Sequence, residues 1–228
     1  MGSPAPAPNH AGAPASPSGA VPWPPALPLV AILRGIRPHE ALAHAQALVE
    51  AGFDCIEVPT NSPDWPASVR AIVAGVAPQV LVGAGTVLSV DDLDSLQAAG
   101  GRLAVSPHVD IDLVAEAVRR GLVVLPGALT PSEVFAAWRA GAHAVKLFPA
   151  GSLGPGHVRA LAAVLPAGLM LLAVGGVTVH TLADYLAAGC GGAGLGTDLY
   201  RPGQPVAATA ERARAFVAAW HAAREARA

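Results

Sequence analysis

The chain has 228 residues and a formal net charge of −2, with 53% apolar but only 13% charged residues. This composition excludes a largely disordered chain, and the near-neutral charge argues against a basic surface for nucleic acid. The apolar stretches reach only about eight residues, whereas a transmembrane helix needs about 20. We therefore expect a globular protein with neither a nucleic-acid nor a membrane partner.

The first 27 residues differ from the rest of the chain. They hold eight of the 22 prolines, and no Lys, Arg, Asp or Glu occurs before Arg34. Proline at this density blocks helix formation, and a targeting peptide would require basic residues. We predict a flexible tail over residues 1–27, no targeting segment, and one folded domain over residues 28–228.

After this tail, short apolar runs alternate with amphipathic segments. The runs predict strands at 28–34, 53–58, 79–84, 102–106, 122–126, 143–148, 169–174 and 192–196. The segments that follow them predict helices at 38–51, 64–77, 90–99, 111–120, 131–140, 156–164, 179–188 and 206–225. Several predicted helices begin after Ser or Thr, a capping residue, and end in Gly, which favours the left-handed conformation.

This repeat predicts the fold. The strands end about every 23 residues, one βα unit at a time, and each strand is a nearly continuous apolar run, as in buried parallel sheets. Eight such units predict a (β/α)8 TIM barrel, an α/β fold with eight parallel strands. A doubly wound open sheet is the alternative, but it would leave the extra strands unexplained.

Three charged residues lie at predicted strand ends, namely Arg34, Glu57 and Lys146. The active site of such a barrel lies at the carboxyl ends of the strands. Strand alternation places Cys55 on the same face as Glu57, and Ala144 on the same face as Lys146. If these faces point inward, the three charges converge, either as a structural ion-pair cluster or as a catalytic site.

Lys146 favours the catalytic interpretation. It is the one lysine beside thirteen arginines, so a simple counter-ion would be expected to be arginine. A buried amine can lose its proton, attack a carbonyl and form a Schiff base, which a guanidinium cannot do. Glu57 is then the natural proton carrier, and the Arg34 guanidinium can hold a substrate carboxylate.

Glycines at other strand ends suggest a phosphate site. Gly175 and Gly176 follow the seventh predicted strand, and Gly196 and Thr197 end the eighth. Loops at these positions bind phosphate in many barrels through backbone N–H groups, although they can be tight turns alone. Thr86, after the third strand, is either a substrate ligand or a helix cap. Together these features indicate a phosphorylated carbonyl substrate.

The remaining reactive residues give no metal or redox motif. Cys55 and Cys190 are far apart in apolar surroundings, and the eight histidines show no ligand spacing. We expect two buried thiols in a cytoplasmic protein, with no metal and no cofactor.

Six motifs in order resemble those of the class I aldolases of 2-dehydro-3-deoxy-phosphosugar acids, over about residues 28–204. They are AILRGI at 31–36, IEVP at 56–59 with NSP at 61–63, GAGTVL at 83–88, VKLFPA at 145–150, VGGV at 174–177 and GLGTDLYRPGQ at 194–204. The resemblance implies a lyase in which Lys146 forms the imine. It also implies a homotrimer.

Two departures favour the phosphogalactonate branch of the family over the phosphogluconate branch. Asn61 occupies a position where the phosphogluconate branch carries Arg, which leaves Arg34 as the expected carboxylate ligand. Val174 stands where that branch tends to place Thr, and it cannot hydrogen-bond a substrate hydroxyl. The two substrates differ in configuration at C4, so we expect Val174 to help the enzyme to distinguish them.

The resemblance therefore implies cleavage of 2-dehydro-3-deoxy-6-phospho-D-galactonate to pyruvate and D-glyceraldehyde 3-phosphate. The nearest alternatives are the same reaction on the gluconate epimer or on 4-hydroxy-2-oxoglutarate. A phosphate-binding barrel without catalysis and a phosphosugar isomerase are alternatives from other classes, and neither would need a Schiff base.

Overall fold

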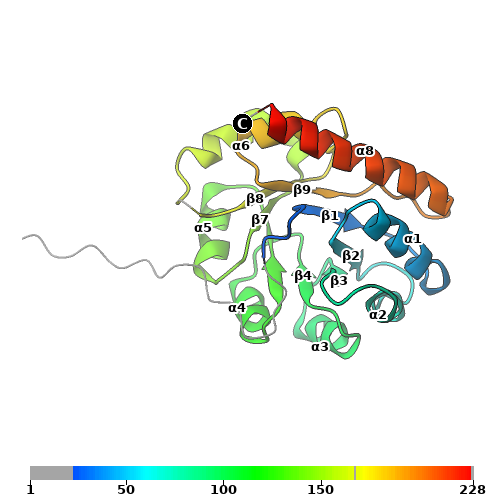
Figure 1. Cartoon of the computed structure of the whole chain (residues 1–228). Helices are drawn as coiled ribbons and strands as arrows, with labels where there is room; N and C mark the ends of the chain where they lie inside the picture. The colour runs from blue at the N-terminus through cyan, green and yellow to red at the C-terminus, as the bar shows by residue number, and fades with distance from the viewer. Residues whose placement is uncertain (1–22, 167, 227–228) are drawn as a thin grey trace, which may run out of the picture.

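A computed structural model describes residues 23–166 and 168–226, which form a nearly closed parallel α/β barrel of the TIM type (Figure 1). One sheet contains nine strands in the order β5-β4-β3-β2-β1-β9-β8-β7-β6. The strands are β1 (Leu29–Ile32), β2 (Cys55–Pro59), β3 (Leu81–Gly85), β4 (Leu103–Val105), β5 (Val123–Leu125), β6 (Gly127–Ala128), β7 (Val145–Leu147), β8 (Leu171–Val174) and β9 (Gly192–Leu195).

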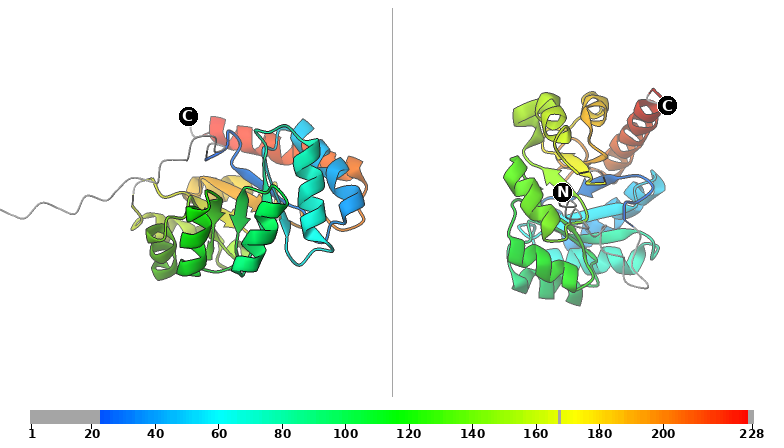
Figure 2. Two further views of the ribbon diagram at one scale, coloured as in Figure 1. Left: turned by 90° about the horizontal axis from the view of Figure 1, so that it is seen from below. Right: turned by 90° about the vertical axis from the view of Figure 1, so that its left-hand side faces the viewer.

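Helices surround this sheet in both further views (Figure 2). They are α1 (Pro38–Glu50), α2 (Trp65–Gly75), α3 (Val90–Ala98), α4 (Ile111–Arg119), α5 (Pro131–Arg139), α6 (Ala150–Ala162), α7 (Leu182–Ala188) and α8 (Val206–Glu225). Each predicted helix has a counterpart here, and α8 packs against α1 and α7. None of these helices is long and apolar enough to cross a membrane.

The fifth predicted strand, 122–126, is observed as β5, and a further short strand that was not predicted, β6, follows it directly. β5 pairs with β4 and β6 pairs with β7, and Pro126 lies between the two segments. Proline has no N–H to donate, so it interrupts a strand, but its carbonyl still accepts the backbone N–H of Lys146 at 2.9 Å. The chain itself therefore connects the two ends of the nine-stranded sheet.

The helix predicted at 156–164 begins earlier, at Ala150. Gly154 has φ +70° and ψ 179°, so α6 consists of two helical segments joined at a kink, with Pro155 directly after it. Because Gly and Pro usually mark a turn, the Gly154-Pro155 pair prevented the hydrophobic periodicity from predicting the first helical segment. The early start places the beginning of α6 directly beside the end of β7.

Predicted caps are confirmed at several helix ends. Ser89 accepts a hydrogen bond from the Asp92 backbone, and Thr130 accepts one from the Glu133 backbone. The glycines that follow five helices all have positive φ: Gly52, Gly100, Gly121, Gly141 and Gly189. Such local rules explain many of the helix boundaries, although α7 begins at Leu182 and not at the predicted residue 179.

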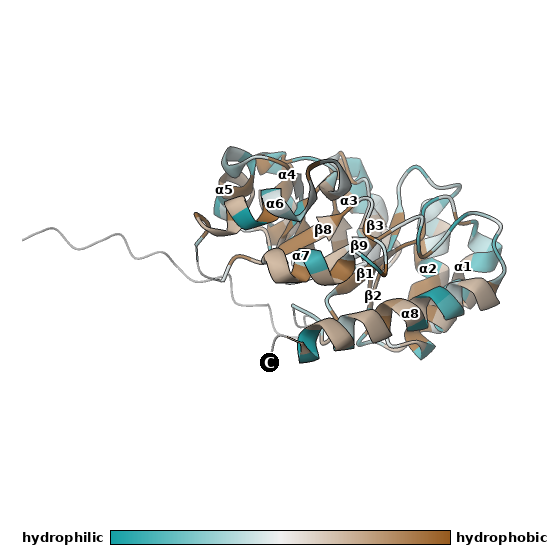
Figure 3. Ribbon diagram, turned by 90° about the horizontal axis from the view of Figure 1, so that it is seen from above, coloured by the Kyte–Doolittle hydropathy of each residue, from teal (hydrophilic) through white to brown (hydrophobic). Residues whose placement is uncertain are grey.

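Two apolar layers hold the barrel together. One fills the interior and includes Ile32, Cys55, Ala144 and Val174, and the other lies between the strands and the helices. Figure 3 shows the hydrophobic colour concentrated on the central strands and hydrophilic segments on the outer helices and loops. Because Cys55 faces the interior, strand alternation also turns Glu57 inward.

The tail predicted over residues 1–27 falls partly outside the described residues, which begin at residue 23. Trp23 packs against the interior layer, and its Nε1 donates to the carbonyl of His143 at 3.1 Å. Leu27 belongs to the outer layer and is only 7% exposed. The packed part of the chain therefore begins earlier than the predicted boundary.

Candidate active site

The sheet order brings the predicted site residues to one end of the barrel, here called the mouth, where the carboxyl ends of the strands lie. Neighbouring strands β3, β2 and β1 lead to Thr86, Glu57 and Arg34. The next three strands, β9, β8 and β7, lead to the remaining candidates: Gly196, Thr197, Val174, Gly175, Gly176 and Lys146. The candidates thus follow six consecutive strands of the sheet.

Lys146 lies in β7 and is only 7% exposed. Its Nζ is 4.9 Å from the centroid of the Phe148 ring, a distance at which an ammonium and an aromatic face attract. Burial lowers the pKa of Lys146, Glu57 raises it in part, and Arg34 lowers it further. This environment favours the neutral amine, which is the nucleophilic form.

Glu57 lies in β2 with only 2% of its surface exposed. Its Oε2 is buried and has no hydrogen-bond partner among the described residues. The backbone of Gly85 lies so close that a Cβ there would collide with the Glu57 carboxylate. Burial raises the pKa of Glu57 to about 7, although Lys146 and Arg34 both oppose the rise. A carboxyl that titrates near neutrality can both accept and return a proton.

Arg34 follows β1 and is exposed. Its Nη1 donates to Oδ1 of Asn61 at 2.7 Å. Because its charge influences the pKa of both Glu57 and Lys146, the three charged groups lie within electrostatic reach of one another. This arrangement is the convergence that strand alternation predicts, with the guanidinium at the open side of the site.

Thr86 has φ +57°, a left-handed conformation that is uncommon for a β-branched residue. The hydroxyl of Thr60 donates to the Thr86 carbonyl at 2.6 Å and holds this turn. Helix α3 is instead capped by Ser89, so Thr86 is not its cap. Such strained backbone persists where the surrounding structure over-determines it, and it often occurs at ligand sites.

The glycine loops after β8 and β9 lie side by side, because Val174 pairs with Gly194. Gly175 and Gly176 have φ +91° and +76°, and the Gly175 carbonyl accepts the N–H of Gly151 at 2.8 Å. The β8 loop thereby lies against the start of α6. Val174 belongs to the interior layer and presents an apolar wall to the mouth.

The β9 loop is more open. A Cβ built on Gly196 would meet no atom within 4 Å, and Thr197 is exposed. The Gly196 carbonyl accepts the N–H groups of Leu199 and Tyr200, both at 2.9 Å. This turn leaves room beside Gly196 for a ligand group to approach the backbone.

The site contains residues that were not among the predicted catalytic and substrate-binding residues. Thr60, Asn61 and Ser62 follow β2 and contact the loops on either side, and Gly85 and Phe148 border the two central ionisable groups. Their position directly after strand ends is a signal that could have identified them, since barrel sites are built from these loops. Their contacts, however, depend on tertiary structure.

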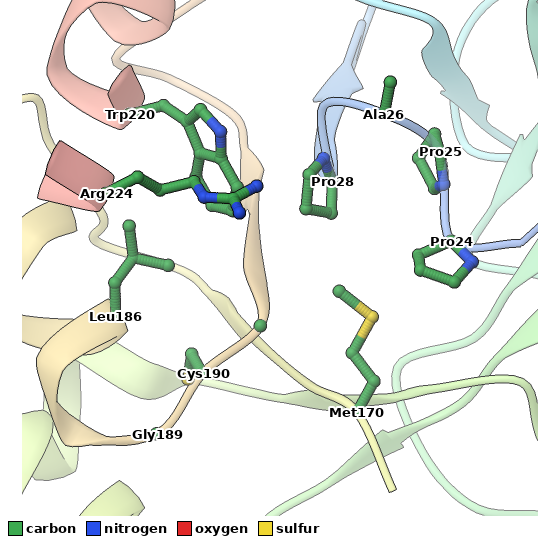
Figure 4. Close-up of a pocket in the computed structure, with 11 residues that line it drawn as sticks. Pro24, Pro25, Ala26, Pro28, Met170, Leu186, Gly189, Cys190, Trp220 and Arg224 are labelled. Atoms are coloured by element: carbon green, nitrogen blue, oxygen red, sulfur yellow. The ribbon is translucent and has the colours of Figure 1, made fainter. Parts of the chain in front are cut away.

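A separate pocket of about 600 Å³ lies at the opposite end, here called the base, where the strands begin (Figure 4). It is largely apolar and is lined by Pro24, Pro25, Ala26, Pro28, Met170, Leu186, Gly189, Cys190, Gly191, Trp220 and Arg224. None of the predicted site residues lines it. Cys55 and Cys190 are both buried free thiols, in agreement with the prediction.

No group of three or more His, Cys, Asp or Glu residues within 23–166 and 168–226 is arranged to hold a metal ion. Within these described residues, the salt bridges join Arg119 to Glu116, and Arg120 to both Asp94 and Glu116. These lie on the outer helices, so the charges at the mouth are not engaged in them. That the protein needs no metal or cofactor stays a prediction.

Comparison with known proteins identifies the family. The family model for KDPG and KHG aldolase matches residues 25–206. The 2-dehydro-3-deoxy-6-phosphogalactonate aldolase of Escherichia coli K12 is 50% identical over 87% of this chain and 97% of its own length. A probable 2-dehydro-3-deoxy-6-phosphogalactonate aldolase of Rhizobium meliloti 1021 is 45% identical over 89% of this chain and 96% of its own.

Structural similarity leads to the same family. A solved structure described as native KDPGal superimposes with a TM-score of 0.87 at 49% sequence identity. The match covers 89% of this chain and 98% of the other. With its buried lysine and glutamate at the mouth of a parallel barrel, this chain belongs to the KDPG and KHG aldolase family.

Proposed function

We propose that this enzyme is a class I aldolase, a carbon–carbon lyase that cleaves 2-dehydro-3-deoxy-6-phospho-D-galactonate to pyruvate and D-glyceraldehyde 3-phosphate. The observation that carries the proposal is Lys146, buried in the barrel with a lowered pKa beside Glu57 and Arg34. The Escherichia coli K12 relative, a 2-dehydro-3-deoxy-6-phosphogalactonate aldolase that is 50% identical to this chain, supports the choice of substrate.

The reaction begins when the neutral amine of Lys146 attacks the C2 ketone. Loss of water from the carbinolamine gives an imine, which carries a positive charge when protonated. Burial, the largest influence on the Lys146 pKa, lowers it and thereby makes the neutral amine easier to form. The cationic imine then serves as the electron acceptor for cleavage.

Glu57 moves the proton in both halves of the reaction. Its carboxylate removes the proton of the C4 hydroxyl, directly or through water, and the C3–C4 bond breaks as the C4 aldehyde forms. The bonding electrons pass to C3 and the imine, which gives the enamine of pyruvate. Glu57 then returns the proton to C3, and water hydrolyses the imine. A pKa of about 7 suits this exchange near neutral pH.

Substrate binding follows the charges and loops of the mouth. Arg34 holds the carboxylate, and the Thr86 hydroxyl contacts the same end of the substrate. At the phosphate end, Gly175 and Gly176 lie beside the start of α6, and Gly196 and Thr197 lie on the neighbouring loop. Together these loops form the proposed phosphate site.

Val174 supports a preference for the galactonate epimer. Its side chain is 5% exposed and cannot donate or accept a hydrogen bond, so it does not stabilise a hydroxyl directed toward β8. The gluconate epimer and 4-hydroxy-2-oxoglutarate are the alternatives. Steady-state kinetics on the two phosphorylated epimers test the preference, and equal kcat/KM values would contradict it.

The proposed organisation is one catalytic domain, predicted over residues 28–228 and extended at its start by the packed residues 23–27, with β5 and β6 acting as a single interrupted strand of a (β/α)8 barrel. We also propose a homotrimer. The exposed apolar side chains of Leu88, Val90 and Ile111, at the starts of the adjacent helices α3 and α4, support such an association. Sedimentation equilibrium measures the subunit number directly. A location in the cytoplasm stays a prediction.

Borohydride trapping tests the central claim. Reduction in the presence of pyruvate should add the mass of one reduced pyruvate per chain, on the peptide that contains Lys146. A binding barrel or an isomerase gains no such mass. Because the chain has a single lysine, an adduct on any other peptide would contradict the mechanism.

A further inference from the structure

Residues 60–62, in the loop after β2, form hydrogen bonds with the loops after β1 and β3 at the mouth. On one side, the Thr60 hydroxyl holds the Thr86 carbonyl. On the other side, Asn61 accepts from the Arg34 side chain, and the Ser62 hydroxyl accepts the N–H of Gly35 at 2.9 Å. Asn61 and Ser62 thus hold the side chain of Arg34 and the backbone that follows it by two separate hydrogen bonds.

The backbone next to Arg34 is fixed from both sides. Ser62 is only 6% exposed, and Gly35 has φ +81°, which a residue with a side chain rarely adopts. A Cβ built on Gly35 would approach Cγ of Pro202 to 2.8 Å. The backbone position from which the Arg34 side chain extends is therefore well defined. The conformational freedom that remains lies in the exposed guanidinium.

The partner of that guanidinium is a neutral amide. The described salt bridges lie on α3 and α4 and do not include Arg34, while Glu57 and Lys146 are the charged groups that it influences. An amide oxygen orients a guanidinium without cancelling its charge, whereas a carboxylate would do both. A guanidinium has five N–H donors, so the bond to Asn61 leaves a forked pair for a substrate carboxylate.

We propose that Asn61 is a positioning residue that orients the Arg34 guanidinium at the mouth while leaving its charge free for the substrate carboxylate. The inference rests on the proposed role of Arg34 and adds a requirement to it. The partner of Arg34 must accept a hydrogen bond, and it must be uncharged. A merely structural contact between the two loops would need only the hydrogen bond.

Two substitutions separate these requirements. Asn61→Ala removes the hydrogen bond, and Asn61→Asp keeps the acceptor but adds a negative charge against Arg34. The measured quantity is the pyruvate concentration that gives half-maximal borohydride trapping, since pyruvate carries the carboxylate end without the phosphate. We expect increases of about fivefold for Asn61→Ala and about tenfold or more for Asn61→Asp, with the maximal trapped fraction unchanged.

Gln97→Glu is the matched control for the added charge. The Gln97 side chain accepts from Nη1 of Arg120 at 3.2 Å on the outer helices, so the same amide-to-carboxylate change beside an arginine occurs far from the mouth. It should leave half-maximal trapping at the wild-type concentration. If Asn61→Asp also matches the wild type, the contact is structural only and the proposal is overturned.

The Arg34→Ala variant distinguishes a failure of this inference from a failure of the proposed aldolase function. It should raise the half-maximal pyruvate concentration, and Asn61→Asp added to it should cause no further rise. A further rise in the double variant would show that Asn61 does not act through Arg34 and would overturn the inference alone. No change in Arg34→Ala itself would remove the carboxylate role of Arg34 and this inference with it, whereas no adduct in the wild type would overturn the aldolase mechanism.

Discussion

The two ends of the barrel differ in the roles of their buried and partly buried side chains. At the mouth, Glu57 is buried with an oxygen that has no hydrogen-bond partner among the described residues, and Thr86 adopts an uncommon backbone conformation. At the base, Trp23 and Met170 pack against the interior layer. Buried unpaired polar groups cost stability, whereas apolar packing supplies it. The difference indicates that function and stability are separated along the barrel axis.

The substitution expected to have the largest effect is Lys146→Arg. The guanidinium keeps the positive charge but cannot become a neutral nucleophile, so kcat should fall by about 10⁴-fold or more. Turnover is measured in a coupled assay for pyruvate, and circular dichroism checks that the barrel is retained. Pyruvate formation within about tenfold of the wild-type rate would mean that cleavage does not need an imine on residue 146, and it would contradict the mechanism.

Gly85→Ala should have the next largest effect, because the new Cβ would collide with the Glu57 carboxylate. Displacement of a proton carrier by about 1 Å costs on the order of 10²-fold in rate. Gly156→Ala is the control, since a Cβ at Gly156 meets no atom within 4 Å. A wild-type kcat in Gly85→Ala would show that the placement of Glu57 tolerates this shift.

The pH dependence should reveal that activity and stability respond oppositely to Glu57. Its pKa is raised to about 7. The carboxylate is the base, so kcat/KM should fall about tenfold per pH unit below that value and level off above it. Glu57→Gln should remove this acid limb, and it should still allow imine trapping.

Stability should change in the other direction. The folded state holds the Glu57 proton up to about pH 7, whereas the unfolded state releases it near the ordinary carboxyl pKa. The stabilisation from the protonated form is therefore complete below the ordinary pKa and is lost as pH rises through about 7. Urea unfolding of the wild type and Glu57→Gln on both sides of this window measures the difference, and parallel pH profiles would contradict the assigned shift.

The sequence predicted local features better than contacts between loops. Apolar runs in strands, capping residues, and glycines directly after helices, such as Gly52, depend only on neighbours in the chain. These signals located nearly every element. Pro126 interrupts a strand whose apolar run continues through it, and Gly154 hides the first turns of α6. Periodicity averages over such single residues, so it did not predict these two features.

The candidate site divides in a similar way. Arg34, Glu57 and Lys146 could be predicted because charges are rare in apolar strands and alternation gives their direction. The bond from Arg34 to Asn61 and the contact of Gly85 with Glu57 depend on loop conformation and on the register of β2 with β3. Nothing in the spacing of these residues reveals them.

Trp23→Ala should have the smallest effect on activity. It tests whether a change at the base alters stability without altering catalysis at the mouth. It removes an indole that packs against the interior layer and the hydrogen bond to His143, so the free energy of unfolding should fall by about 2 kcal/mol. Because the site lies at the mouth, kcat/KM should stay within about twofold, the range expected when no catalytic contact changes. Trp23→Phe keeps most of the ring and should lose less stability. A large fall in kcat/KM with an unchanged free energy of unfolding would mean that residues at the base affect catalysis at the mouth. It would contradict the separation of function and stability along the barrel axis.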